Sequence, residues 1–129
     1  MKVEDLMIED WLLYKSDSNV FPIQITREMF NNELVVWNDR FEPIQLTPDI
    51  LKKNGFVNSY IDLSLNKDSV YKYNHFYTGN SVIVDMESNK LIVKYENDIW
   101  MNLPYNRTIY VHELQHVLKH CDIKKEIII

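Results

Sequence analysis

Apolar and polar residues alternate in short stretches along most of the chain, and this pattern predicts strands. Clusters of Asn, Asp, Ser or Gly, which are turn-forming residues, separate the stretches about every eight to twelve residues. In the first half, strands are expected over residues 10–15, 20–30, 33–37 and 40–46. In the second half, they are expected over residues 60–65, 70–77, 81–86 and 91–95. Short strands joined by tight turns are typical of antiparallel sheets.

Two segments carry helix signals instead. Thr47 supplies a capping hydroxyl before Pro48 and Asp49, and this combination typically begins a helix. That helix is expected to end at Asn54-Gly55, because glycine favours the left-handed conformation that terminates helices. A longer helix is expected over residues 108–121, with Thr108 as its cap. A single helical turn is expected within residues 3–8.

Together these elements predict an α+β fold with mostly antiparallel short strands. Residues 1–46 are expected to form a small, SH3-like barrel lobe, in which Pro43 marks an edge strand. Residues 47–129 are expected to form an α+β lobe, a sheet packed by one C-terminal helix. The two lobes would be separate domains or parts of one compact domain. The segment Ile127–Ile129 is too apolar to stay exposed, so we expect it to add a last strand.

Composition narrows the class of protein. The 129 residues are 46% hydrophobic and 26% charged, as in ordinary globular proteins. The formal net charge of −5 argues against a nucleic-acid partner, because phosphate binding depends on clustered Lys and Arg. No apolar run is long enough to span a bilayer, and no signal-peptide core follows Met1. With Cys121 as the one cysteine, a cytoplasmic location without membrane contact is expected.

One motif suggests chemistry. His112-Glu113-Leu114-Gln115-His116 matches the H-E-x-x-H pattern of zinc metallopeptidases. Histidines four residues apart lie on one helical face and can share a zinc ion, and the glutamate can act as base for a zinc-bound water. The alternative function is therefore a zinc-dependent hydrolase, with His112 and His116 as metal ligands and Glu113 as the catalytic residue.

Several features of the sequence disfavour a zinc site. Only thirteen residues follow His116, although the third ligand of most such peptidases lies downstream. Asp122 and His75 are the two candidates for that ligand. His120 continues the same helical stripe, but three collinear histidines cannot surround one tetrahedral ion. The simpler interpretation is a solvated polar face on a packing helix, with no cofactor and no catalytic residue.

Three segments of the chain resemble a group of short, uncharacterised proteins of Bacteroidetes and their phages and prophages. They are the opening around Asp5–Trp11, the Leu-Thr-Pro-Asp-Ile-Leu-Lys-Lys-Asn-Gly-Phe string at 46–56, and the Tyr-Val-His-Glu-Leu-Gln-His string from Tyr110. Glu9 departs from the group, which usually has glycine there. The resemblance implies a mobile-element origin and a shared architecture, but it implies no activity.

Two further features have ordinary structural interpretations. Tyr71, Tyr73, His75 and Tyr77 fall on one strand face and are suited to stacking against a ring, but such a stripe is more often sheet core. Cys121 lies on the apolar face of the last predicted helix, so we expect it to be buried and unreactive.

The function expected from the sequence is a small, non-enzymatic binding protein, an accessory factor of a phage or mobile element. No combination of nucleophile, base and oxyanion donor can be assembled from the residues. The expected partner is another protein or a second copy of the chain, bound through edge strands at Pro43 or Ile127–Ile129.

Overall fold

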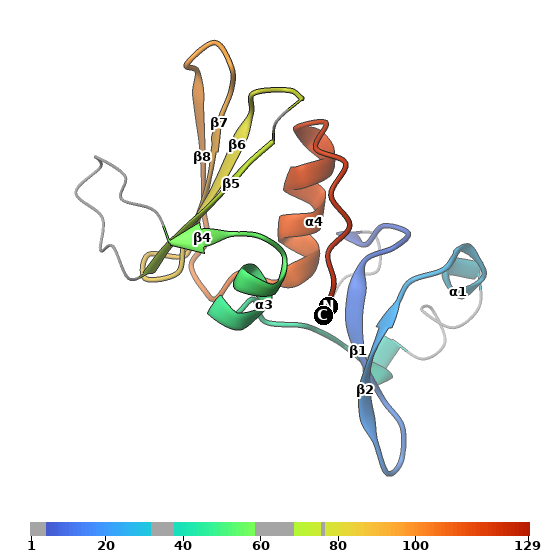
Figure 1. Cartoon of the computed structure of the whole chain (residues 1–129). Helices are drawn as coiled ribbons and strands as arrows, with labels where there is room; N and C mark the ends of the chain where they lie inside the picture. The colour runs from blue at the N-terminus through green and yellow to red at the C-terminus, as the bar shows by residue number, and fades with distance from the viewer. Residues whose placement is uncertain (1–4, 32–37, 59–68, 76) are drawn as a thin grey trace.

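The computed structural model describes residues 5–31, 38–58, 69–75 and 77–129. Its fold is α+β, as predicted, and two antiparallel sheets dominate it (Figure 1). The first sheet has the strand order β2-β1-β3, and its strands are Trp11–Lys15 (β1), Val20–Gln24 (β2) and Phe41–Pro43 (β3). A short helix, α1 (Arg27–Asn31), and a 3₁₀ turn, η2 (Asn38–Arg40), accompany it. We call residues 5–43 the N-terminal lobe.

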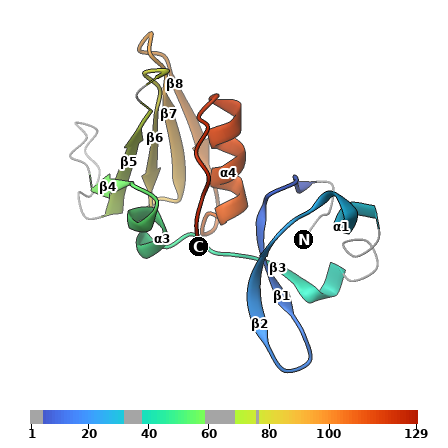
Figure 2. The same ribbon diagram turned by 45° about the vertical axis from the view of Figure 1, so that its right-hand side comes forward.

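The second sheet is a simple meander in which each strand pairs with the next along the chain. Its order is β4-β5-β6-β7-β8, with strands Val57–Asn58, Val70–Asn74, Ser81–Asp85, Lys90–Lys94 and Trp100–Pro104. Helix α3 (Pro48–Lys53) precedes the meander, and helix α4 (Val111–His120) follows it. Figure 2 shows α4 against one face of this sheet, between the sheet and the N-terminal lobe.

The main hydrophobic core lies between α4 and the inner face of the five-stranded sheet. On β6 and β7, Val82, Val84, Leu91 and Val93 are completely buried, and Leu114 and Leu118 of α4 are nearly so. Met86 and Tyr95 pack beside them, half-buried. This confirms that the two alternating stretches of residues 81–86 and 91–95 line a common core.

The start and end of α3 follow the sequence prediction. The Thr47 hydroxyl accepts a hydrogen bond from the Ile50 N–H at 3.2 Å, and Pro48 occupies the first turn. Past the helix, Gly55 has φ +85°, and Phe56 is 1% exposed. A left-handed glycine after the last turn ends the helix without strain.

The N-terminal lobe differs from the prediction. Its described strands form an open sheet and not a closed SH3-like barrel. The stretch 20–30 is not one strand, because β2 ends at Gln24 and α1 begins at Arg27, where Arg, Glu and Met all favour helix. The strands expected at 33–37 and 60–65 lie outside the described residues.

The C-terminal segment is not a strand, contrary to prediction. Ile127 is buried at 2% exposure, but the backbone beside it pairs with side chains. Asn54 accepts the Ile128 N–H through Oδ1 and donates from Nδ2 to the Ile128 carbonyl, both at 2.7 Å. The amide group of Asn54 thus replaces a neighbouring strand.

Replacing Asn54 with Ala should destabilise the protein. Nδ2 also donates to the Ile50 carbonyl at 2.7 Å, so the substitution removes three hydrogen bonds of a residue that is 2% exposed. We expect a loss of about 2–3 kcal/mol in urea unfolding, with faster hydrogen exchange at Ile128. Lys53→Ala is the matched control, since it removes an exposed bond to the Ile129 carbonyl and should cost less than about 0.5 kcal/mol. Equal losses in the two variants would contradict this role of Asn54.

Candidate functional site

The His-Glu-Leu-Gln-His motif occupies the first half of α4, on the side that faces the N-terminal lobe. The helix begins at Val111, with Tyr110 as its N-cap. The prediction that Thr108 is the cap is therefore wrong. Glu113 instead accepts a hydrogen bond from the Tyr110 N–H at 2.8 Å, as the third residue of a helix does in a capping box. His112 is buried and His116 contacts the N-terminal lobe, so this part of the polar stripe is not a solvated face, whereas His120 is exposed. We call the contacts of Gln115 and His116 with residues 9–11 the seam between the lobes.

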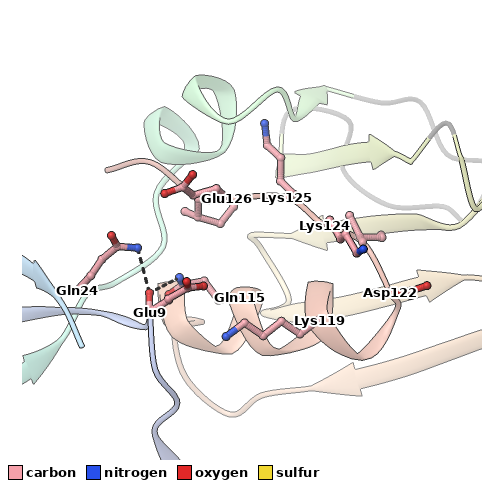
Figure 3. Close-up of a pocket in the computed structure, with 10 residues that line it drawn as sticks. Glu9, Gln24, Gln115, Lys119, Asp122, Lys124, Lys125 and Glu126 are labelled. Carbon is pink, nitrogen blue, oxygen red and sulfur yellow. Dashed lines mark hydrogen bonds between the residues drawn. The ribbon is translucent and has the colours of Figure 1, made fainter. Parts of the chain in front are cut away.

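Gln115 joins α4 to the backbone at the start of β1. Its Oε1 accepts the Trp11 N–H, and its Nε2 donates to the Glu9 carbonyl, both at 2.9 Å. Gln115 is 7% exposed, so these bonds are shielded from water. Figure 3 shows the Glu9 carbonyl accepting hydrogen bonds from Gln115 and, from β2, Gln24. The Trp11 ring is held as well, because its Nε1 donates to the Ile127 carbonyl at 2.7 Å.

His116 is paired with Asp10. Its Nε2 lies 2.7 Å from Asp10 Oδ2, which also accepts the Met7 N–H at 2.7 Å. Asp10 is completely buried, and a buried carboxylate needs such partners to offset its loss of hydration. Since a carboxylate accepts, His116 donates from Nε2, the nitrogen that would otherwise be free to bind a metal ion.

Glu113 has both carboxylate oxygens engaged. Arg107 donates to Oε1 at 2.7 Å and to Oε2 at 3.1 Å, and Oε1 also accepts the helix cap bond from Tyr110. The hydrogen bond that Arg107 donates to Glu113 raises the pKa of the Arg107 guanidinium, so the arginine stays charged. A glutamate bound in this way anchors the start of α4, and its oxygens are turned to Arg107.

His112 lies within a stack of planar groups. The Arg107 guanidinium lies 4.1 Å from the centre of the Tyr110 ring, and that ring stacks on His112 at 5.7 Å between centres. The His116 ring meets His112 edge-on at 5.6 Å. Burial lowers the pKa of His112, although the charge of Asp10 opposes the shift. Its Nδ1 and Asp10 Oδ1 are buried without a hydrogen-bond partner among the described residues.

A cleft of about 520 Å³ opens beside these histidines. The sheet side contributes Leu103, Tyr105 and Arg107, and the N-terminal lobe contributes Asp5 and Pro43. The floor is the motif face of α4, lined by Tyr110, His112, Glu113, His116, Val117 and His120.

Neither residue proposed as a third zinc ligand lines this cleft. His75 lies at the end of β5, where its Nδ1 is 2.9 Å from the Thr78 hydroxyl. Asp122 follows α4 in a left-handed conformation, with φ +56°, and lines a different pocket (Figure 3). Within the described part of the chain, no three His, Cys, Asp or Glu side chains are grouped so as to hold a metal ion.

The second pocket lies between the start of β1, the outer side of α4 and the C-terminal segment. Its volume is about 530 Å³, and charges of both signs line it (Figure 3). The basic residues are Lys119, Lys124 and Lys125, and the acidic ones are Glu9, Asp122 and Glu126. Part of this charge is engaged, since Lys119 donates to the Ile8 carbonyl at 3.1 Å. This balance of charges favours neither an anionic nor a cationic ligand.

The other candidates from the sequence are structural. Tyr71 is 3% exposed and Tyr73 packs on the main core, whereas Tyr77 beyond the strand is 89% exposed. The aromatic stripe is thus core over β5 and does not continue as a stacking platform. Cys121 is buried, as predicted, and burial raises the pKa of its thiol, which disfavours the reactive thiolate.

Comparison with protein-family models, with curated proteins and with solved structures finds no match to this chain. None of the helices in the described residues is long and apolar enough to cross a membrane.

Gln115→Ala should loosen the seam between the lobes. The substitution leaves the Trp11 N–H buried without its acceptor, so we expect a loss of about 2–3 kcal/mol in urea unfolding. Gln24→Ala removes the other, more exposed donor to the Glu9 carbonyl, at 3.2 Å, and should cost below about 0.5 kcal/mol. A Gln115 variant as stable as the Gln24 variant would show that the seam does not depend on this side chain.

Stability should fall as the pH drops below about 6.5, the ordinary pKa of histidine. The lowered pKa of His112 means that the unfolded chain takes up this proton first, so acid favours unfolding. The free energy of unfolding, measured at several pH values between 7.5 and 5.5, should decline less steeply in His112→Gln than in the natural protein. His120→Gln, at an exposed position of the same helix, is the control that also removes one histidine, and its slope is the reference for His112→Gln.

Proposed function

We propose that this protein is a non-enzymatic binding protein that acts in the cytoplasm as an accessory factor of a phage or other mobile element. The observation that carries the proposal is that the polar side chains of the motif form hydrogen bonds to other parts of the fold. Glu113 anchors α4 through Arg107 and Tyr110, and Gln115 and His116 hold the N-terminal lobe. These contacts account for the sequence pattern without catalysis. The mobile-element origin rests on the resemblance described above.

The partner is proposed to be a protein bound at a strand edge. A free edge presents N–H and C=O groups that an extended segment can pair with. Pro43, the edge residue expected from the sequence, lies in a three-residue strand beside the cleft, and the Ile127–Ile129 segment is not a strand. The edge of β8 offers a longer surface, with Trp100 44% exposed at its start.

The zinc-dependent hydrolase is the alternative, and metal analysis separates it from the proposal. Protein purified without chelator should carry well under one zinc per chain, and its unfolding midpoint should not change with chelator. Glu113→Gln should lower stability by about 1–2 kcal/mol, because it removes the ion pair with Arg107 and weakens the helix cap.

The opposite pattern would overturn the proposal. It consists of about one zinc per chain, lost in His116→Ala with the fold intact, and peptide hydrolysis abolished in a zinc-loaded Glu113→Gln variant. Circular dichroism of each variant establishes that the fold is retained.

A further inference from the structure

The edge strands of the two sheets are not equally protected. β2 carries Pro22 in its middle, which interrupts any ladder of donors, and β3 is three residues long and ends in Pro43. β4 has two residues. β8 has five residues, Trp-Met-Asn-Leu-Pro, without a charge, and it is longer than β3 although it too ends in a proline, Pro104. Proteins normally block edge strands with charges, prolines or shortness, so β8 is the least protected edge in the described part of the chain.

The hydrogen bonds at both ends of β8 show which of its backbone groups face away from β7. Tyr95 N–H donates to the Ile99 carbonyl at 2.8 Å, and Tyr105 N–H donates to the Asn89 carbonyl at 2.9 Å. Both pairs fit the β7–β8 register, in which Val93 lies opposite Met101. Because bonded and non-bonded pairs alternate in antiparallel sheets, residues 99, 101, 103 and 105 bond to β7 or to the residues that flank it. Trp100 and Asn102 therefore direct their N–H and C=O groups away from β7. Pro104 directs its carbonyl the same way.

We propose that β8 pairs with β8 of a second copy of this chain, antiparallel about a two-fold axis at Asn102. This inference rests on the proposed function, and it names the partner at that edge. The pairing would join the two sheets into one ten-stranded sheet. Two copies of Asn102 would exchange their N–H and C=O groups at the axis, and each Trp100 N–H would donate to the partner's Pro104 carbonyl.

The side chains are complementary in this register. On the outer face, Trp100 lies opposite the partner's Pro104, and an indole ring packs well on a flat pyrrolidine. On the inner face, Met101 lies opposite the partner's Leu103, and both are half-buried apolar residues. Each Ile99, which is 58% exposed, lies opposite the partner's Tyr105. No like charges meet between residues 99 and 105, so a chain with a net charge of −5 meets little repulsion at this edge.

The interface is small, so the dimer should be weak. Five paired residues bury less area than a standard stable interface, and we expect a dissociation constant of about 1–100 µM. Sedimentation equilibrium of the purified chain over this range should show a monomer–dimer equilibrium. Trp100→Ala should raise the dissociation constant about tenfold or more, because exposed tryptophans dominate such contacts.

Three variants test the register. Asn102→Pro removes the N–H at the axis, which faces away from β7, and should abolish the dimer while circular dichroism stays unchanged. Asn102→Ala keeps that N–H and should retain a dimer. Phe21→Ala is the matched control for apolar surface, since Phe21 is 43% exposed on β2, and it should leave the dimer unaffected.

Two outcomes would overturn the inference. A natural chain that stays monomeric at 100 µM excludes the symmetric pairing, and a dimer unaffected by both Asn102→Pro and Trp100→Ala places the interface elsewhere. Neither result affects the outcome of the metal analysis, so the non-enzymatic proposal is tested separately. If the natural chain is monomeric but captures a protein from host lysate that Asn102→Pro does not capture, the edge serves a different chain.

Discussion

The buried carboxylate of Asp10 sets the main constraint on this fold. A completely buried aspartate needs hydrogen-bond donors, and here Oδ2 receives them from Met7 in the N-terminal lobe and from His116 on α4. Next to it, Gln115 supplies an acceptor and a donor to the backbone on either side. The lobes are thus held together by directed polar contacts as well as by the apolar packing of Trp11 and Leu13 on the main core, and the polar contacts favour one orientation.

The local features of the fold could be predicted from the sequence. Thr47-Pro48 and Asn54-Gly55 mark the ends of α3 by short-range chemistry. The alternation that indicates β6 and β7 can likewise be read from two neighbouring stretches of the chain. β8 was missed because Trp100, Met101 and Leu103 place apolar side chains on both faces, which hides the alternation. The C-terminal segment was misassigned because its partner is the side chain of Asn54, 74 residues earlier.

The same distinction applies to the site. The motif was visible in the sequence, but the residues that explain it were not. Asp10 lies 106 residues before His116, and nothing near Asp10 marks it as a buried partner. Arg107 is six residues before Glu113, and it binds through a loop whose course the spacing does not determine. A five-letter pattern thus identified the important face of α4, but the contacts that this face makes depend on residues far from it in the sequence.

The seam also orders events during biosynthesis. Residues 9–11 leave the ribosome more than a hundred residues before Gln115 and His116, so the donors and acceptors that hold them do not yet exist. Until α4 is made, the Asp10 carboxylate remains hydrated and β1 pairs only with β2 and β3. Docking of the two lobes therefore has to follow synthesis of α4, and the long sequence separation of its contacts slows it relative to formation of either sheet.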